Sequence, residues 1–250
     1  MDSMKGSVAW ITGGSSGIGL AAARAFARLG AAVVISGRGL EALERAKREL
    51  RELGADAHHA ALDVTDADAC VAVAQQILAR HGRIDVLVNS AGLNVARRSW
   101  SEVSLQGWND VFAANVNGTF HCIAAVLPAM RERRSGHVVN VSSWAGRFDS
   151  RAAGPAYVSA KHAVSALTRS LNMEEFPNGI RATALCPGEV ATPIMARRAV
   201  PPTPEQLATM LQVEDLEATF SYLAQLPARV CVNEIVLSPT QNGAFGRPGS

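Results

Sequence analysis

The stretch ITGGSSGIG, residues 11–19, joins an apolar run to a helical pattern and carries spaced glycines at Gly13, Gly17 and Gly19. Glycine permits the tight turn and the close backbone approach that a pyrophosphate needs. A helix starting here also offers free N–H groups and its positive dipole end to phosphate. A glycine turn alone also marks ordinary loops, but its place between strand and helix favours a dinucleotide-binding turn. The other residues expected to contact the dinucleotide in this turn are Ser15, Ser16 and Ile18.

Outward from this turn, strands and helices alternate along the chain. Strands are expected at 7–11, 31–36, 57–64, 84–89, 137–143, 180–188 and 232–239. Helices are expected at 17–30, 41–54, 66–82, 101–134, 155–177 and 213–226. Short apolar strands separated by helices predict a parallel sheet of about seven strands with right-handed crossovers and helices on both faces. The fold class is therefore α/β, a doubly wound Rossmann fold.

No linker or repeat interrupts the alternation, so residues 1–250 are interpreted as a single domain. The proline-rich piece at 199–206 is expected to be a surface excursion. Residues 241–250 are expected to form a flexible C-terminal tail.

Composition and charge exclude several classes of protein. The chain has 250 residues, 48% of them hydrophobic and 18% charged, which suits a folded domain with a large core. The net charge of +2 and the scattered basic residues do not favour nucleic-acid binding. The apolar segment 120–130 is too short to span a membrane and contains Pro128, and no secretory signal is evident. We expect a cytoplasmic protein with no membrane partner.

Cysteines and histidines show no metal-binding or redox spacing. Cys70, Cys122, Cys186 and Cys231 are widely spaced and are expected to be reduced and mostly buried. The adjacent histidines at 58 and 59 fall in an expected strand, so their side chains should point to opposite faces. No metal site is therefore expected.

The end of the second expected strand bears on the choice between NAD and NADP. Chains that select NAD commonly place an acidic residue there, whereas this chain has Gly37 and Arg38. A guanidinium can pair with the phosphate that distinguishes NADP, and a carboxylate would repel it. Arg38 thus favours NADP(H); the alternative is a solvated surface arginine.

One of the chain's two tyrosines, Tyr157, lies four positions before Lys161 within an expected helix. Residues four apart share a helix face, so the phenol and the ammonium are expected to meet. An unperturbed tyrosine has a pKa of about 10. A neighbouring ammonium lowers that pKa by favouring the phenolate, which would suit an acid–base catalyst.

A series of motifs resembles the short-chain dehydrogenase/reductase family from about residue 5 to about residue 240. They are TGGSSGIG (12–19), LDV (62–64), NSAG (89–92), Asn115, VSSWAG (141–146), YVSAK (157–161) and PGEVAT (187–192). NSAG departs from the usual NNAG at Ser90, a change between small polar residues. The resemblance implies an oxidoreductase whose cofactor is contacted by Asp63, Val64, Asn89, Ala91, Gly92, Tyr157, Lys161, Pro187, Gly188, Val190 and Thr192.

The resemblance also implies the catalytic roles. Tyr157 is expected to be the general acid in reduction and the general base in oxidation, with Lys161 tuning it and holding the nicotinamide ribose. Ser143 is expected to donate a hydrogen bond to the substrate oxygen, and Asn115 to support a water chain to the lysine. Ser142 competes for the serine role, but the following WAG matches the family when Ser143 is used. As isolated residues, Ser143 could cap a turn and Asn115 could bend a helix.

The expected substrate is a small or medium alcohol or carbonyl compound. The C-terminal segment is similar to the branch of NADP-dependent hydroxy-acid dehydrogenases and broad-range aldehyde or ketone reductases. Arg97 and Arg98 could attract a carboxylate or be ordinary exposed loop arginines. Trp144, Phe148 and Met195 could line an apolar pocket, but the first two could equally belong to the core or to a subunit contact. The alternatives are a silent dinucleotide sensor, which the intact catalytic set opposes, and an epimerase, which would need an added substrate domain. By resemblance, a homo-oligomer, dimer or tetramer, is expected.

Overall fold

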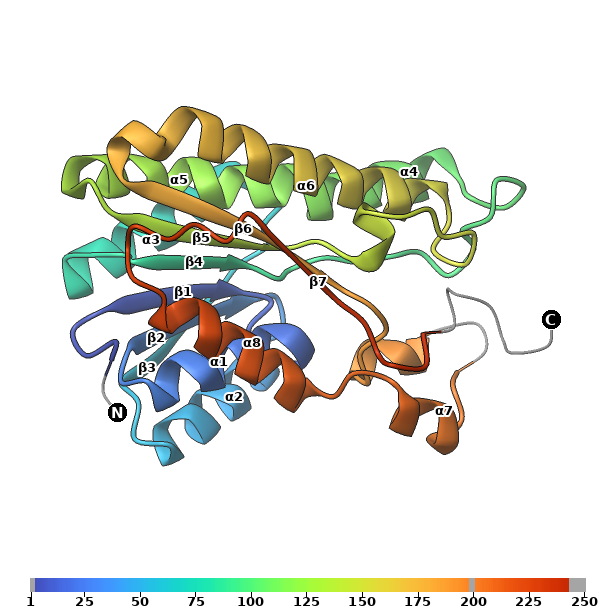
Figure 1. The fold of residues 1–250 in the computed structure, drawn as a ribbon, viewed down its shortest axis with the longest axis horizontal. Helices are drawn as coiled ribbons and strands as arrows, with labels where there is room; N and C mark the ends of the chain where they lie inside the picture. Colours follow the sequence, from blue (N-terminus) through green and yellow to red (C-terminus); the bar gives the residue numbers. More distant parts are fainter. Residues whose placement is uncertain (1–2, 198–200, 243–250) are drawn as a thin grey trace.

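The computed structural model describes residues 3–197 and 201–242, and a parallel sheet forms its centre (Figure 1). Within those residues the sheet has seven strands in the order β3-β2-β1-β4-β5-β6-β7. The strands are β1 (Val8–Thr12), β2 (Ala32–Gly37), β3 (Ala57–Ala61), β4 (Val86–Asn89), β5 (Gly136–Val141), β6 (Ile180–Pro187) and β7 (Glu234–Leu237). All neighbouring strands pair in parallel. The predicted doubly wound α/β fold is confirmed, and the strand order reverses between β1 and β4, where such folds bind ligands.

Helices cover both faces of the sheet (Figure 1). One layer contains α1 (Gly17–Arg28), α2 (Leu40–Glu52) and α8 (Val213–Gln225). The other contains α3 (Ala67–His81), α4 (Leu105–Phe112), α5 (Gly118–Arg133) and α6 (Pro155–Glu175). The short helix α7 (Pro204–Thr209) stands apart from both layers.

Strand alternation divides the core between these layers. In β1, Ile11 packs into the cluster beneath α1 and α8, whereas Trp10 packs into the cluster beneath α3 and α5. Phe26 of α1 and Phe220 of α8 meet with ring centroids 6.3 Å apart. Both rings are almost completely buried. Fully burying such a side chain contributes roughly 2–3 kcal/mol, so this pair attaches α8 firmly to α1.

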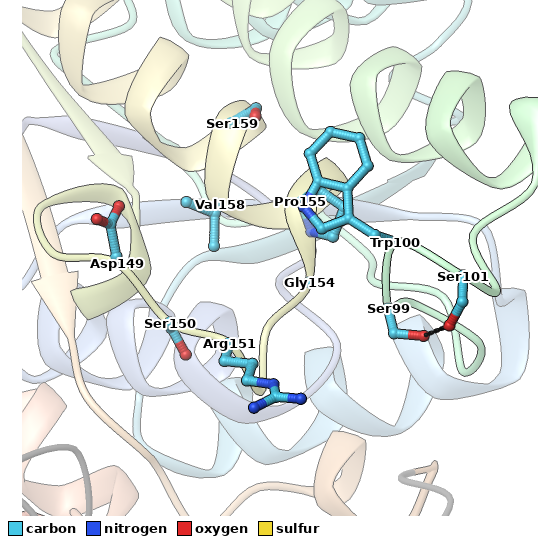
Figure 2. Close-up of a pocket in the computed structure, with 10 residues that line it drawn as sticks. All are labelled: Ser99, Trp100, Ser101, Asp149, Ser150, Arg151, Gly154, Pro155, Val158 and Ser159. Carbon is cyan, nitrogen blue, oxygen red and sulfur yellow. Dashed lines mark hydrogen bonds between the residues drawn. The ribbon is translucent and has the colours of Figure 1, made fainter.

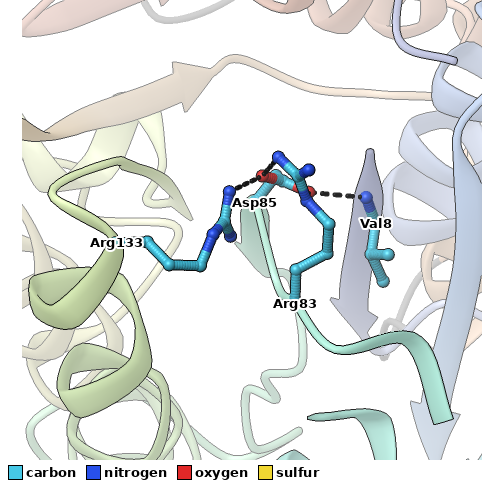
Figure 3. A network of polar contacts seen from close by, with 4 residues as sticks. All are labelled: Val8, Arg83, Asp85 and Arg133. Carbon is cyan, nitrogen blue, oxygen red and sulfur yellow. Dashed lines mark hydrogen bonds and ion pairs between the residues drawn. The ribbon is translucent and has the colours of Figure 1, made fainter. Parts of the chain in front are cut away.

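An ion-pair network closes the amino-terminal edge of the sheet (Figure 3). The Asp85 carboxylate, just before β4, accepts hydrogen bonds from the Val8 N–H at 2.8 Å, from Arg83 at 2.6 and 2.7 Å, and from Arg133 at 2.8 Å. Burial would raise the pKa of Asp85, but these bonds outweigh it and hold that pKa below its usual value. The network therefore joins β1, β4 and the end of α5.

Several boundaries differ from the sequence predictions. The helical region expected at 101–134 begins only at Leu105, and Ala113–Asn117 form a π-helical turn between α4 and α5. The proline-rich piece 199–206 already enters α7 at Pro204, and its residues 199 and 200 lie outside the described residues. Most of the tail expected at 241–250 also lies outside them, since the description ends at residue 242.

The continuous helical stretch Leu105–Arg133 is long and apolar enough to cross a membrane, by length and composition alone. The apolar segment 120–130, which is too short to span a membrane by itself, lies within this stretch. In its most apolar window 44% is buried. The core helix of a soluble protein has the same properties, and α5 packs Cys122, Val126 and Met130 into the core.

The cysteines and the paired histidines are arranged largely as predicted. All four cysteines are free; Cys70, Cys122 and Cys186 are buried, whereas Cys231 is exposed. Their spacing along the chain concealed one contact, because the Cys70 and Cys122 sulfurs lie 3.7 Å apart. His58 faces Asp56, while His59 faces Glu44 of α2, so the two rings point to opposite faces of β3 as expected.

Candidate active site

The glycine turn packs tightly against the neighbouring loops. Gly13 has φ +64°, and a Cβ there would lie 2.8 Å from the Ala91 nitrogen. A Cβ on Gly19 would lie only 2.3 Å from the Gly13 oxygen. Gly17 has φ +53°, and a Cβ there would lie 3.3 Å from the Thr192 side chain. Side chains at Gly13 and Gly19 would therefore disrupt the turn. The turn also contacts segments 89–92 and 187–192.

Helix α1 begins at this turn with an open N-terminus. Its N-cap, Ser16, is extended, and its side chain makes no capping bond. The first turn contains no acidic residue that would repel a phosphate. Free N–H groups and the positive end of the helix dipole therefore point into the turn, which fits the pyrophosphate of a dinucleotide.

Arg38, Ser15 and Asp63 lie near one another at the carboxyl end of β2. A Cβ on Gly37 would approach the Ser15 hydroxyl at 3.8 Å, so Ser15 lies over the end of β2. Arg38 follows directly and is exposed. The pKa of Asp63 is lowered by hydrogen bonds from the backbone and hydroxyl of Thr65, and further by the nearby Arg38 charge. This region offers a cation and a hydroxyl beside a carboxylate that is held ionised.

Val64 lies where α5 begins. A Cβ on Gly118 would come within 2.5 Å of the Val64 side chain, so only glycine permits this contact. The Val64 carbonyl also lies 3.0 Å from Nδ1 of His121. The loop after β3 is thus held by α5 from two positions.

The NSAG segment is anchored from below by polar side chains. The Thr12 hydroxyl accepts hydrogen bonds from the N–H groups of Ser90 and Ala91, both at 3.2 Å. Buried Asn89 donates to the Asn140 side chain at 2.9 Å. Sequence reasoning missed both anchors. Asn140 left one signal, a polar residue in the middle of an apolar strand.

Tyr157 and Lys161 share one face of α6, as their spacing predicted. The Lys161 ammonium lies 5.5 Å from the centre of the Tyr157 ring and donates to the Val141 carbonyl at 2.8 Å. The lysine is only 6% exposed, whereas the tyrosine is half-buried. Burial lowers the pKa of Lys161 from its ordinary 10.5 to about 8. The lysine can therefore exchange a proton near neutral pH.

Asn115 lies within the π-helical turn, and its side chain lies close to Gly92, near the Lys161 ammonium. Its side chain accepts from the Leu93 N–H at 2.9 Å and donates to the Leu93 carbonyl at 2.8 Å. A Cβ on Gly92 would lie 2.3 Å from the Asn115 oxygen and 3.7 Å from the Lys161 nitrogen. Asn115 and Lys161 therefore meet at Gly92, and π-turns often occur at such functional positions.

The two serines after β5 have different surroundings. Buried Ser142 donates to the Lys161 backbone carbonyl at 2.9 Å and lies 2.9 Å from the Ser165 hydroxyl. Ser143 is half-buried, and its oxygen accepts from the Ala145 N–H at 3.1 Å. It thus caps a turn, yet its hydroxyl hydrogen stays available to another acceptor. The Ser142 hydroxyl is already bonded to the Lys161 backbone carbonyl, so Ser143 is the better candidate to bind the substrate oxygen.

Segment 187–192 links β7, Leu211 and the glycine turn. The Gly188 N–H donates to the Leu237 carbonyl at 2.6 Å, which ties the end of β6 to β7. Val190 forms an isolated bridge with Leu211. Thr192 then reaches the glycine turn at Gly17.

A pocket of about 660 Å³ opens beside the start of α6 (Figure 2). Its lining comes from two loops and the first turns of α6: Ser99, Trp100, Ser101, Asp149, Ser150, Arg151, Gly154, Pro155, Val158 and Ser159. Tyr157 and Ser143 do not line it. The pocket therefore lies on the side of α6 away from the tyrosine–lysine face, and Arg151 rather than Arg97 or Arg98 is its cation.

Comparison with known proteins identifies the family. A family model described as short chain dehydrogenase matches residues 7–201. The chain belongs to this family of oxidoreductases. It is 33% identical over 240 residues to an uncharacterized oxidoreductase of Staphylococcus saprophyticus, an alignment covering 96% of this chain and all of that one. A candidate ketoacyl reductase associated with the monensin polyketide synthase of Streptomyces virginiae is 38% identical over 192 residues, with coverage of 76% and 73%.

Solved structures of dehydrogenases and reductases share the complete fold. An alcohol dehydrogenase from the archaeon Thermococcus sibiricus, complexed with 5-hydroxy-NADP, superposes with a TM-score of 0.85 at 30% identity, covering 98% of this chain and 99% of that one. A variant of the actinorhodin polyketide ketoreductase with NADPH superposes with a TM-score of 0.86 at 30% identity, with coverage of 96% and 98%. The family resemblance read from the motifs is confirmed.

Proposed function

We propose that this protein is an NADP(H)-dependent oxidoreductase that interconverts a small or medium carbonyl compound and its alcohol, with Tyr157 as the acid–base catalyst. The observation that carries the proposal is the buried Lys161 ammonium 5.5 Å from the Tyr157 ring, on the face that also meets Asn115. When bound, the nicotinamide supplies or accepts the hydride.

The chain's own residues would manage the proton. In reduction, Tyr157 gives its hydroxyl proton to the substrate oxygen, and the Lys161 ammonium favours the phenolate that forms. Ser143 donates a hydrogen bond to the same oxygen as negative charge develops there. Asn115, beside Lys161, supports the return of a proton from solvent. In oxidation, each proton transfer runs in reverse.

The cofactor would lie along the carboxyl ends of the central strands. The glycine turn and the start of α1 suit the pyrophosphate, and Asp63 with Val64 suits the adenine side. Arg38 and Ser15 suit the extra phosphate of NADP. Solved relatives complexed with NADP or an NADP derivative support this assignment.

Relatives named as a ketoacyl reductase, an alcohol dehydrogenase and a serine dehydrogenase support this substrate class. We propose that the chain works as one catalytic domain in the cytoplasm. The free thiols of Cys70 and Cys122, 3.7 Å apart, suit a reducing compartment.

The test is turnover by Tyr157→Phe with a panel of ketones, aldehydes and 3-hydroxy acids, using NADPH or NADP. We expect the variant to bind NADPH normally and to lose roughly a hundredfold or more in kcat, the usual contribution of a positioned acid. The matched control is Tyr222→Phe, because Tyr222 is the only other tyrosine and is exposed. If NADPH binds, no panel member turns over and Tyr157→Phe changes nothing, the protein is a sensor instead.

We also propose self-association through the outer faces of α5 and α6. Phe120 of α5 and Met173 and Phe176 at the end of α6 are exposed apolar side chains on this layer. Light scattering should give the mass of a dimer or tetramer. Phe120→Glu should reduce that mass, whereas the matched change Leu53→Glu, beside α2 on the other layer, should not.

A further inference from the structure

We propose that Asp56, His58 and His81 form a binding site for a divalent transition-metal ion such as Zn²⁺. The three residues lie at the amino-terminal end of the edge strand β3 and at the last residue of α3. This is the opposite end of β3 from Asp63, so the site is separate from the proposed cofactor cradle. No part of the proposed oxidoreductase reaction uses these residues.

The ligand atoms already converge. One atom from each residue lies within 4.8 Å of the other two. His58 Nε2 is 2.7 Å from Asp56 Oδ1, and His81 Nδ1 is 4.0 Å from Asp56 Oδ2. Ligands that each lie about 2 Å from zinc are at most about 4 Å apart, so closure by less than about 1 Å completes the site.

His81 gives an independent indication of a ligand. Its side chain is only 10% exposed, and Nδ1 faces Asp56 Oδ2 at 4.0 Å, too far for a hydrogen bond. Within the described part of the chain, the buried Nε2 has no hydrogen-bond partner. A buried imidazole without a partner is costly, because it has lost its bonds to water without replacement. A metal ion bound at Nδ1 would give that nitrogen a ligand bond in place of its long contact with Asp56.

The surroundings allow both entry of the ion and adjustment of the ligands. Asp56 is 63% exposed, so its carboxylate can turn from His58 toward a shared ion, and water can occupy the remaining position. The two imidazole rings, 5.4 Å apart between centroids, are tilted by 57° rather than stacked. The charge of Arg80 also reaches His81 and opposes a cation, whereas the Asp56 charge favours one.

The donor set selects the type of metal. Two imidazoles and one carboxylate suit Zn²⁺, Ni²⁺ or Cu²⁺, whereas Mg²⁺ and Ca²⁺ prefer oxygen ligands alone. A bound ion would fasten the C-terminus of α3 to the edge strand β3. It would therefore stabilise the native state by mass action.

The experiment is calorimetric titration of the full chain with Zn²⁺, with thermal unfolding as a second readout. A Cys231→Ser background removes the exposed thiol as a competing ligand. We expect one ion per chain, a higher Tm with Zn²⁺, and no such shift with Mg²⁺. Asp56→Asn and His58→Gln should each weaken binding at least roughly tenfold, since even changes outside the ligand shell cost 10–100-fold.

His59→Gln is the matched control, because this neighbouring histidine faces Glu44 on the other side of the strand. It should leave Zn²⁺ affinity unchanged. Circular dichroism and NADPH affinity, which none of these changes should alter, show that the variants are folded. Absence of stoichiometric Zn²⁺ binding, or an equal loss of affinity in the His59 variant, overturns the proposal.

Discussion

Lys161 shows at the scale of one residue how a functional group can oppose stability. Its ammonium is buried and donates a hydrogen bond to the Val141 carbonyl, and burial lowers its pKa to about 8. A base whose pKa is lower in the folded state destabilises the fold while it is protonated. The cost is complete below about pH 8 and disappears as the pH rises past 10.5.

Lys161→Met should therefore raise the free energy of unfolding at pH 7 while it removes activity. The pKa shift corresponds to about 3 kcal/mol, and the lost hydrogen bond offsets about 1 kcal/mol of that. Urea unfolding at pH 7 and pH 10.5 measures the gain, which should shrink at the higher pH. Lys5→Met, at an exposed position, is the control. A variant less stable than the parent at pH 7 would contradict this account.

Arg38 should determine the preference for NADP(H). Arg38→Asp should weaken NADPH binding at least roughly tenfold, because a charge-assisted hydrogen bond is lost and a repulsion is added. NADH affinity should stay the same or improve. Fluorescence titration with each cofactor measures both. The control is Arg45→Asp, an exposed arginine of α2, and an equal loss for NADH would defeat the assignment.

The roles of site residues could be predicted where they depend on spacing along the sequence, but not where they depend on tertiary packing. The tyrosine–lysine pair follows from a spacing of four on one helix. The hydrogen bond from Ser142 to the Lys161 backbone carbonyl could not be predicted from the sequence. Adjacent serines are equivalent in sequence, and only the structure shows that their side chains have different partners. Thr12, which holds the NSAG segment, gives no signal beyond the motif that contains it.

At the scale of elements, Asp85 joins three of them. Its lowered pKa means that it stabilises the fold above its unfolded pKa of about 3.9 and that this stabilisation is lost as the pH falls through the lower folded value. Asp85→Asn should cost about 2 kcal/mol at pH 7, because Arg133 and Arg83 lose their charged partner. Urea unfolding measures this cost.

The difference between Asp85→Asn and the parent should diminish in acid. Glu132→Gln, at an exposed position of α5, is the control and should be nearly neutral. A difference that persisted unchanged to pH 2 would mean that the carboxylate charge is not what stabilises the junction.

Elements with a clear period were predicted to within a few residues, and the π-helical turn was not. Apolar and polar residues from 105 to 133 fit an uninterrupted helix. The extra residue of the π-turn arises from contacts distant in sequence, such as Asn115 with Leu93 and Gly118 with Val64. Local periodicity carries no record of such contacts.

At the scale of the whole molecule, alternation of strands and helices predicted a doubly wound parallel sheet of about seven strands, and the strand order came only from the structure. The pocket beside Trp100 was not predicted, since it depends on where two irregular loops meet. The cluster of Asp56, His58 and His81 was also hidden, because His81 comes from a different element than His58.

The packing of α8 on α1 has a consequence for synthesis of the chain. Phe26 is among the first core side chains to be made, but Phe220, which covers it, is translated long afterwards. During that interval the apolar face of α1 lacks its native partner. The nascent chain therefore exposes a hydrophobic surface that chaperones and other incomplete chains can bind. Ribosome-bound intermediates of this protein should accordingly aggregate until α8 has emerged from the exit tunnel.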